Sequence, residues 1–283
     1  MEKIYVTDLD GTLLGNDGKL SDYSRTMLRQ LIGDGANISL ASARNLASIR
    51  RLMCGVQFRL PVIEINGSFL SDYNTGCHLR INDIPSDIAW QICRLCEEHN
   101  CMPFVAAFDG KEDHLFYETL TNEGMEWFLA DKSEDHSERL KQRKLTAEIL
   151  DMHIVCFVVI GKMEVVKRLN TELREKFGYE LDSYFFCNPY SPQWQWLTIH
   201  DKNAQKSNGI HELLELKGFS YQQLTVFGDN DNDKAMMEMN KLGAVSVAVE
   251  NAVDQIKAAA SKICQSNQND GVVRYIAEDF YGS

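Results

Sequence analysis

Two apolar, β-branched runs that lie far apart in the chain each end in a cluster of carboxylates. Residues 4–6 (Ile-Tyr-Val) lead to Asp8 and Asp10, and residues 224–227 (Leu-Thr-Val-Phe) lead to the acidic stretch at 228–233. Runs of this composition predict buried strands. Ligands of an open parallel sheet bind beyond the carboxyl ends of its strands, so acids that follow two neighbouring strands can meet there. The pattern therefore predicts an α/β fold with a site at one edge of its sheet.

Asp8 and Asp10 are separated by one residue, and strand alternation places such residues on the same side. Two carboxylates on one side repel each other unless a cation lies between them. Mg²⁺ is the expected ion, because it binds one or two carboxylates together with phosphate oxygens. The alternative is an ordinary Asp-Gly turn ending at Gly11, since Asp and Gly favour turns for conformational reasons alone. The second acidic cluster favours the metal site.

Strand and helix patterns alternate in the first and last parts of the chain, which predicts a doubly wound parallel sheet. A hairpin is expected at 69–71 and 78–81, and a mixed α+β pattern follows it. Because 283 residues exceed what one core usually holds, two units are expected, 1–82 with 193–283 and an insertion at 83–192. The expected elements of the first unit are strands at 3–7, 37–40, 61–65, 224–227 and 244–249, and helices at 21–31, 45–53, 203–216 and 231–239.

Four motifs, in this order along the chain, resemble those of the haloacid dehalogenase superfamily of phosphatases, and of its Cof-type group (subfamily IIB). They are Asp8-Leu-Asp10-Gly-Thr, Ala-Ser-Ala-Arg at 41–44, Lys206, and Gly-Asp at 228–229 with Asn232 and Asp233. The resemblance implies a Rossmann-like core and an inserted type-two cap at 83–192 that closes over the site and selects the substrate. It also implies a Mg²⁺-dependent phosphatase that acts on small phosphorylated metabolites such as sugar phosphates.

The resemblance further implies a role for each motif residue. Asp8 matches the nucleophile that forms an aspartyl phosphate, and Asp10 matches the acid/base residue. The metal ligands would be Asp8, the Asp10 backbone carbonyl and Asp229, with Asp233 behind them. The expected phosphate-binding positions are Leu9 and Ala43 through their backbone amides, Ser42, Lys206 and Asn232.

Some of these positions have a second interpretation. Ser42 is also a good helix cap, and Lys202 is an available competitor of Lys206 as a point charge. The segment Asn-Gly-Ser at 66–68 resembles the family's Asn-Gly-Ala, which lines the cleft, but it also fits a structural turn. The candidate cleft or substrate contacts are Arg44 and Asn66 in the core and Asp109, His114 and Tyr190 in the inserted unit.

Cys93, Cys96, His99 and Cys101 lie close enough in sequence to resemble a zinc site. Residues 88, 92, 95, 96 and 99 follow helical spacing, however, and free cysteine behaves as a small buried hydrophobe. A core helix is therefore the favoured interpretation. The other cysteines lack the spacing of a disulfide framework, and we expect all of them to be reduced.

Charge and hydropathy limit the partners of the chain. A net charge of −12 argues against nucleic acid as a main partner, although a divalent ion can still attract phosphate inside a local cleft. No apolar run has the length of a membrane span, and the first residues lead directly into a strand pattern. We expect a cytoplasmic monomer or homodimer whose partner is a small phosphorylated metabolite. The alternatives to a phosphatase are a sugar phosphomutase and a non-catalytic relative that binds a phosphorylated ligand.

Overall fold

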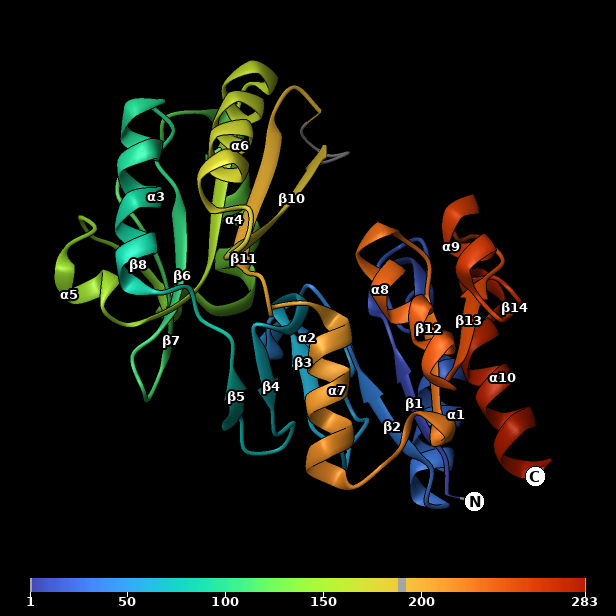
Figure 1. Ribbon diagram of the computed structural model, residues 1–283. Helices are drawn as coiled ribbons and strands as arrows, with labels where there is room; N and C mark the ends of the chain where they lie inside the picture. The colour runs from blue at the N-terminus through green and yellow to red at the C-terminus, as the bar shows by residue number, and fades with distance from the viewer. Residues whose placement is uncertain (1, 188–191, 283) are drawn as a thin grey trace. The chain divides into compact units, whose positions relative to one another are not determined.

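The computed structural model describes residues 2–187 and 192–282, without the side chains of residues 134–137, 186 and 187. The chain divides into two compact units (Figure 1). Unit 1 comprises Met1–Arg80 and Gln205–Ser283, and unit 2 is the insertion Ile81–Ala204. Each unit has its own sheet and its own hydrophobic core.

Unit 1 is built on a five-stranded sheet in the order β14-β13-β12-β1-β2, in which every pairing is parallel. Its strands are β1 (Ile4–Thr7), β2 (Asn37–Leu40), β12 (Leu224–Gly228), β13 (Val245–Val249) and β14 (Lys262–Cys264). Thr7 of β1 lies opposite Phe227 of β12, so the chain leaves both strands at the same edge. Both strands are buried along their length, as in parallel sheets covered on both faces. The predicted doubly wound α/β class is confirmed.

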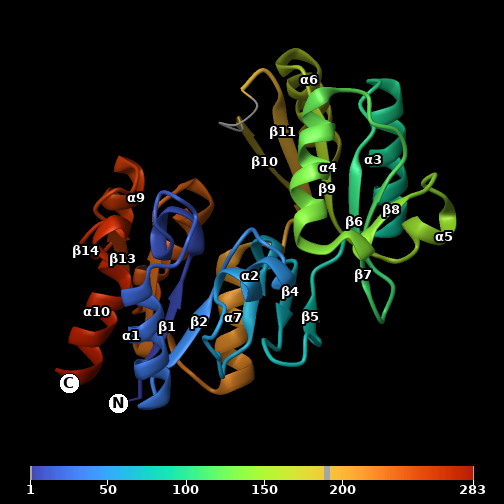
Figure 2. The same cartoon turned by 180° about the vertical axis from the view of Figure 1, so that it is seen from behind.

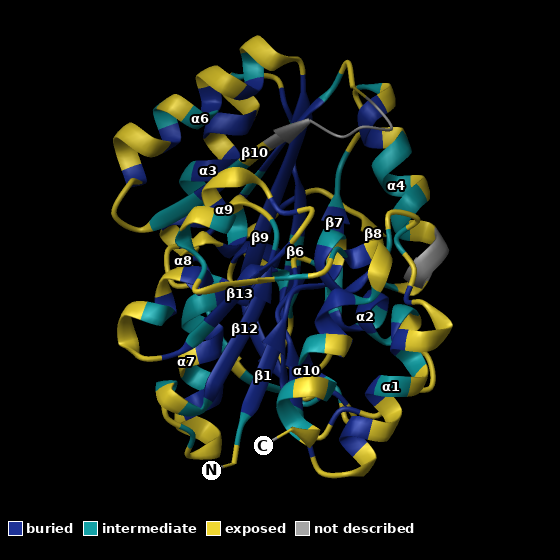
Figure 3. Cartoon of the chain, turned by 90° about the vertical axis from the view of Figure 1, so that its right-hand side faces the viewer, coloured by how far each residue is buried: buried dark blue, intermediate teal, exposed yellow. Residues whose placement is uncertain are grey.

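Helices cover both faces of this sheet. In Figure 3, α7 and α8 lie on one side of it and α1 and α10 on the other, and α1 packs against α10 while α7 packs against α8. The predicted helix at 231–239 is broken into two short turns, Asp231–Asp233 and Glu238–Leu242, with α8 between them. The helices of unit 1 are α1 (Asp22–Gly33), α2 (Leu46–Leu52), α7 (Lys206–Lys217), α8 (Lys234–Met237), α9 (Asp254–Ala259) and α10 (Gly271–Tyr281).

A small sheet continues unit 1 beyond β2. Its order is β3-β4-β5, with bounds β3 (Val62–Glu64), β4 (Phe69–Ser71) and β5 (His78–Ile81). Ala41 forms a parallel bridge with Ile63, which joins this sheet to the end of β2. The expected hairpin at 69–71 and 78–81 is confirmed by neighbouring β4 and β5.

Unit 2 contains a six-stranded sheet in the order β10-β11-β9-β6-β7-β8, antiparallel except for the β7–β8 pair (Figure 2). One face packs against α3 and α6 around a core that includes Phe157 and Leu197. The strands are β6 (Phe104–Phe108), β7 (Asp113–Tyr117), β8 (Leu140–Gln142), β9 (His153–Gly161), β10 (Leu181–Cys187) and β11 (Gln195–Asp201); the helices are α3 (Ser86–Glu98), α4 (Glu123–His136), α5 (Ala147–Leu150) and α6 (Met163–Phe177). The inserted α+β unit is therefore present.

The expected boundaries at 83 and 193 are corrected to Ile81 and Gln205. The larger difference concerns β11, whose residues fall in the range that we expected for unit 1 and in which we predicted no strand. It pairs on one side with β10 and on the other with β9, so its backbone belongs to the sheet of unit 2. An apolar strand carries the same pattern in either sheet, and only its hydrogen-bonding partners distinguish the two.

Candidate active site

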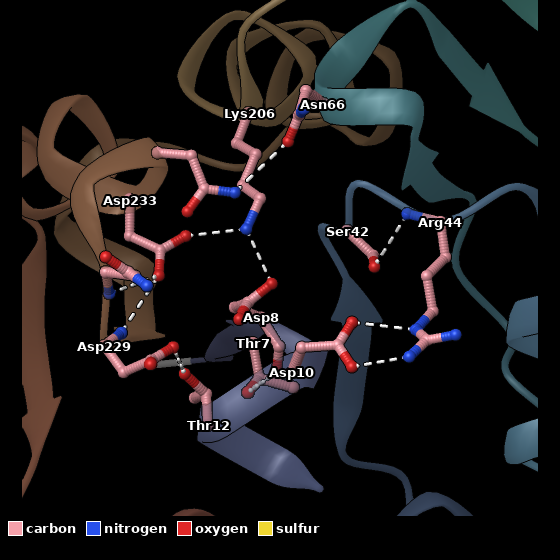
Figure 4. Close-up of polar contacts among 12 residues, drawn as sticks. Thr7, Asp8, Asp10, Thr12, Ser42, Arg44, Asn66, Lys206, Asp229 and Asp233 are labelled. Carbon is pink, nitrogen blue, oxygen red and sulfur yellow. Dashed lines mark hydrogen bonds and ion pairs between the residues drawn. The ribbon is translucent and has the colours of Figure 1, made fainter. Parts of the chain in front are cut away.

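The acids predicted to meet at the sheet edge do so. Asp8 directly follows β1 and Asp229 directly follows β12, and Asp233 lies in the turn after Asp229. Each of the three offers a carboxylate oxygen within 4.8 Å of the others, and within residues 2–187 and 192–282 this is the one group with such metal-ligating geometry. Figure 4 shows the three side chains pointing toward one another.

Lys206 is the cation of this cluster. It begins α7, and its side chain is almost fully buried. Its Nζ donates to Asp8 Oδ1 at 2.6 Å and to Asp233 Oδ1 at 2.7 Å (Figure 4). The competing Lys202 is exposed and belongs to unit 2. The structure therefore brings Lys206, and not Lys202, to the acids.

Burial and crowding shift the protonation of the cluster. Burial raises the pKa of Asp8 well above its ordinary value, and Lys206 opposes this while Asp233 and Asp229 add to it. Burial also raises the pKa of Asp229 to about 6, against the lowering effect of a hydrogen bond from Thr12. For Lys206 burial acts to lower the pKa, but Asp233 and Asp8 outweigh it and the net shift is upward. One ammonium group thus leaves the three carboxylates short of positive charge.

Asp233 is held by donors on several sides. Its Oδ2 accepts the backbone N–H groups of Asp229 at 2.9 Å and of Asn230 at 3.2 Å, in addition to the Lys206 bond on Oδ1. A Cβ added at Gly228 would lie 2.7 Å from the Asp233 carboxyl carbon, so this approach requires glycine. Asp233 therefore fixes the loop and Lys206, and Asp8 and Asp229 are the better candidates for metal ligands.

Gly11 and Thr12 complete the loop that follows Asp8. Gly11 adopts φ +79°, and a Cβ there would lie 2.4 Å from Asp229 Oδ2, so both its conformation and its surroundings require glycine. Thr12 Oγ1 donates to Asp229 Oδ1 at 2.8 Å. Sequence reasoning missed Thr12 as a site residue, although it is part of the first motif. It links the two acid loops directly.

Asp10 does not point to the acid cluster. Its carboxylate accepts two hydrogen bonds of 2.7 Å from Arg44, one from Nε and one from a terminal nitrogen, in a bidentate ion pair (Figure 4). The Asp10 side chain is 48% exposed, whereas Asp8 is buried. The two acids of the first motif thus occupy different environments, and the idea that their side chains share one cation is not supported.

The second motif lies beside this ion pair. Ser42 is buried and its Oγ accepts the Arg44 backbone N–H at 3.1 Å, while Asn45 caps α2 by accepting the Ser48 N–H. Ser42 is therefore not the cap of α2. Ala43 is exposed and is not one of the described residues with positive φ.

Asn66 and Asn232 connect the loop after β3 with the loop after β12. Asn232 Nδ2 donates to Asn66 Oδ1 at 3.2 Å, and Asn66 itself has a left-handed backbone with φ +56°. The turn interpretation of Asn66 and the cleft interpretation are thus compatible. Leu9, expected to act through its backbone amide, is buried directly after Asp8.

The donor set fits a hard divalent cation. Oxygen ligands from carboxylates are what Mg²⁺ prefers. Burial, with a smaller contribution from the neighbouring carboxylates, raises the pKa of Asp8 and Asp229, and such a cation would oppose this shift. Asp8 and Asp229 are the residues of this cluster that could hold it.

A family model described as haloacid dehalogenase-like hydrolase matches residues 5–276 of this chain. The chain belongs to this hydrolase family. It is 23% identical to the 5-amino-6-(5-phospho-D-ribitylamino)uracil phosphatase YitU of Bacillus subtilis over 96% of both chains. It is 22% identical to the pyridoxal phosphate phosphatase YbhA of Escherichia coli over 97% of both chains.

A solved structure extends the comparison to the inserted unit. The HAD subclass IIB sugar phosphatase BT4131 matches with a TM-score of 0.73 over 99% of both chains, at 18% sequence identity. Because the match covers nearly the whole chain, this hydrolase shares with that protein both the parallel-sheet core and the separate antiparallel-sheet unit.

The candidate contacts of the inserted unit are only partly described. Asp109 Oδ2 and His114 Nε2 lie 2.9 Å apart in the β6–β7 hairpin, and Asp109 also accepts the backbone N–H groups of Lys111 and Glu112. The hydrogen bond from His114 is the main reason that the pKa of Asp109 is lowered. Both residues thus stabilise their own hairpin. Tyr190 lies outside the described residues.

The cysteine-rich segment of this hydrolase forms a helix and its end. Cys93 and Cys96 are buried on α3, Cys101 is buried just beyond it, and His99 Nε2 lies 2.9 Å from Glu172. The core-helix interpretation is confirmed. In the described part of the chain, no helix combines the length and apolar character that membrane crossing requires.

Proposed function

We propose that this hydrolase is a Mg²⁺-dependent phosphatase that releases phosphate from a small phosphorylated metabolite through an aspartyl-phosphate intermediate. One observation carries the proposal. Asp8 is buried at the end of β1, its Oδ1 lies 2.6 Å from the Lys206 ammonium nitrogen, and a carboxylate oxygen of Asp229 lies within 4.8 Å of one of its own. A carboxylate becomes a useful nucleophile when fixed cations neutralise the phosphoryl group that it must approach.

In the proposed reaction the Asp8 carboxylate attacks phosphorus, and the bond from phosphorus to the leaving oxygen breaks. Asp10 gives its proton to that oxygen and then accepts a proton from the water that attacks the acyl phosphate, which returns Asp8 and releases phosphate. When bound, Mg²⁺ would neutralise phosphoryl oxygens and help to align them. Lys206 contributes a fixed positive charge, and Ser42, Asn232 and the backbone amides of Leu9 and Ala43 contribute hydrogen-bond donors.

The Arg44 ion pair sets a condition on the role of Asp10. Its carboxylate accepts two hydrogen bonds from Arg44, so it must give up at least one of them to reach a leaving oxygen. A phosphate dianion is an alternative partner for a guanidinium group. We propose that substrate phosphate takes over part of the Arg44 interaction and thereby frees Asp10.

The relatives support the substrate class. YitU and YbhA are named for phosphorylated small molecules, and the structural neighbour BT4131 is described as a sugar phosphatase. We propose the same class here, with unit 2 as the cap that selects among such substrates. We further propose that the hydrolase acts in the cytoplasm as a monomer or homodimer, and size-exclusion chromatography with light scattering tests the oligomeric state.

The experiment is a phosphate-release screen of the purified protein. The panel contains sugar phosphates, pyridoxal phosphate and 5-amino-6-(5-phospho-D-ribitylamino)uracil, each with Mg²⁺ and with a chelator. We expect Mg²⁺-dependent release that is absent in Asp8→Asn. Release that persists in Asp8→Asn refutes the nucleophile assignment, and an isomerised phosphate ester without free phosphate identifies a mutase instead.

A further inference from the structure

Glu64, the last residue of β3, is a buried carboxylate that lies outside the acid cluster. One carboxylate oxygen accepts the backbone N–H of Leu46, the first residue of α2, at 2.5 Å. The other accepts the hydroxyl of Ser71 on β4, also at 2.5 Å. Burying a carboxylate is costly unless hydrogen bonds compensate for the lost water. A buried glutamate at this position therefore needs a reason.

The surrounding donors fit an acceptor-only group. Ser71 has one hydroxyl proton and donates it to Glu64, so its 2.7 Å contact with His78 Nδ1 uses a proton of the imidazole. His78 Nδ1 is also 3.5 Å from Glu64, and the ring stacks on Phe69 with centroids 3.8 Å apart. The Glu64 carboxylate is thus held in one orientation by groups from α2, β4 and β5.

The Leu46 bond is part of the attachment of the 42–46 loop to residues 63–66, the end of β3 and the turn that follows it. Four of the described hydrogen bonds contribute to this attachment, and three of them join backbone groups only. Of the four, the Glu64 bond is the one that a side chain supplies, so a substitution can remove it selectively. The backbone bonds are Ser42 N–H to Ile63 O at 2.9 Å, Asn66 N–H to Ser42 O at 2.9 Å, and Ile65 N–H to Arg44 O at 3.1 Å.

The position of this loop determines the position of Arg44. The guanidinium group meets Asp10 through two parallel bonds of 2.7 Å, a geometry that small displacements disturb. A displacement of about 1 Å at a reacting group can lower a rate by about 100-fold. A contact that fixes the Arg44 backbone therefore also fixes the orientation of the Asp10 carboxylate.

We propose that Glu64 is a positioning residue, which fixes the 42–46 loop and through it the contact between Arg44 and Asp10. Its part in catalysis rests on the proposed phosphatase function. Loss of the carboxylate leaves the Leu46 N–H without its acceptor and releases the end of the loop next to Arg44, whereas an amide at the same place can keep that bond.

The activity test compares two variants of Glu64. Glu64→Met removes both acceptors at similar size, and we expect kcat/KM for the best substrate of the screen to fall by about 10-fold to 100-fold, mainly through kcat. Glu64→Gln retains an amide oxygen for the Leu46 N–H and is expected to restore most of the rate. Ser39→Ala removes another buried hydrogen bond of unit 1, from Ser39 Oγ to Pro61 O at 2.6 Å, and serves as the control for a merely structural effect.

We expect Ser39→Ala to lower stability and to leave the rate of the folded protein unchanged. A wild-type rate in folded Glu64→Met overturns the proposal. Equal losses in Glu64→Met and Glu64→Gln also overturn it, because the geometry of the acceptor would then be irrelevant.

A second readout does not depend on activity. The Arg44 Nε–H signal in a ¹⁵N NMR spectrum is identified by its loss in Arg44→Lys, and its exchange with water reports the Asp10 ion pair. We expect exchange at least about tenfold faster in Glu64→Met and close to wild type in Ser39→Ala. Unchanged exchange in Glu64→Met refutes the positioning role. If the wild-type protein shows no phosphatase activity, the proposed function fails while this signal still tests Glu64.

Discussion

Replacing Lys206 by methionine removes the ammonium group that Asp8 and Asp233 share. Both carboxylates are buried, and Lys206 lies 2.6 Å and 2.7 Å from them. Removing one partner of a buried ion pair costs about 3–5 kcal/mol, since the remaining charge stays buried without compensation. We therefore expect Lys206→Met to lose about 3–5 kcal/mol of unfolding free energy at neutral pH without divalent ions. The loss should shrink as the pH falls, because protonation neutralises the stranded carboxylates.

Urea denaturation followed by two spectroscopic probes measures the free energy of unfolding. All four tryptophans (90, 127, 194 and 196) belong to unit 2, so their fluorescence reports that unit, and far-UV circular dichroism reports both. The loss should appear in the dichroism transition of unit 1. Lys217→Met, an exposed site at the end of the same helix, is the matched control and should cost less than about 1 kcal/mol.

The double variant Lys206→Met with Asp8→Asn should recover part of the stability, because one of the two stranded charges is gone. A loss of unfolding free energy below about 1 kcal/mol in Lys206→Met would refute the reasoning. A loss that is reduced neither by lowering the pH nor by adding Asp8→Asn would also refute it.

Three further changes test other parts of the account. Thr12→Val removes the hydrogen bond that lowers the pKa of Asp229, so that pKa should rise beyond about 6. The Mg²⁺ concentration for half-maximal binding should then increase, and more at pH 6 than at pH 8; an increase of equal size at both pH values contradicts this. Gly11→Ala places a Cβ 2.4 Å from Asp229 Oδ2 at φ +79° and should abolish Mg²⁺ binding, whereas Gly18→Ala, also at positive φ (+71°) but with open space around it, should keep it. Burial lowers the pKa of His200 to about 4, so between pH 6.5 and 4 only the unfolded state gains this proton, and unit 2 should lose about 3 kcal/mol of unfolding free energy over that interval. Urea denaturation followed by tryptophan fluorescence should show a smaller pH dependence of this free energy in His200→Leu, and an unchanged pH dependence would contradict the assignment.

The sequence was most informative where local composition determines the structure. Asp8 and Asp229 could be placed at one sheet edge because each follows a short buried run, and parallel strands end together. Lys206 could be chosen over Lys202 only through the family resemblance, since neither lysine carries a local signal of burial.

Other features depend on tertiary contacts that no local pattern encodes. The bidentate pairing of Asp10 with Arg44 joins residues of two loops, and alternation alone predicted instead that Asp10 would face the same centre as Asp8. Residues 195–201 fell in the range expected for unit 1 with no strand predicted, whereas as β11 they pair with β9 and β10 of unit 2. The buried role of Glu64 was not foreseen, because glutamate at the end of a strand is usually exposed.

Isothermal titration calorimetry of Mg²⁺ binding tests most directly whether acids from the two ends of the chain share one ion. We expect one Mg²⁺ per wild-type chain, and loss of that binding in both Asp8→Asn and Asp229→Asn while Asp231→Asn, an acid of the same loop outside the cluster, retains it. Undiminished binding in either Asp8→Asn or Asp229→Asn would contradict the shared site.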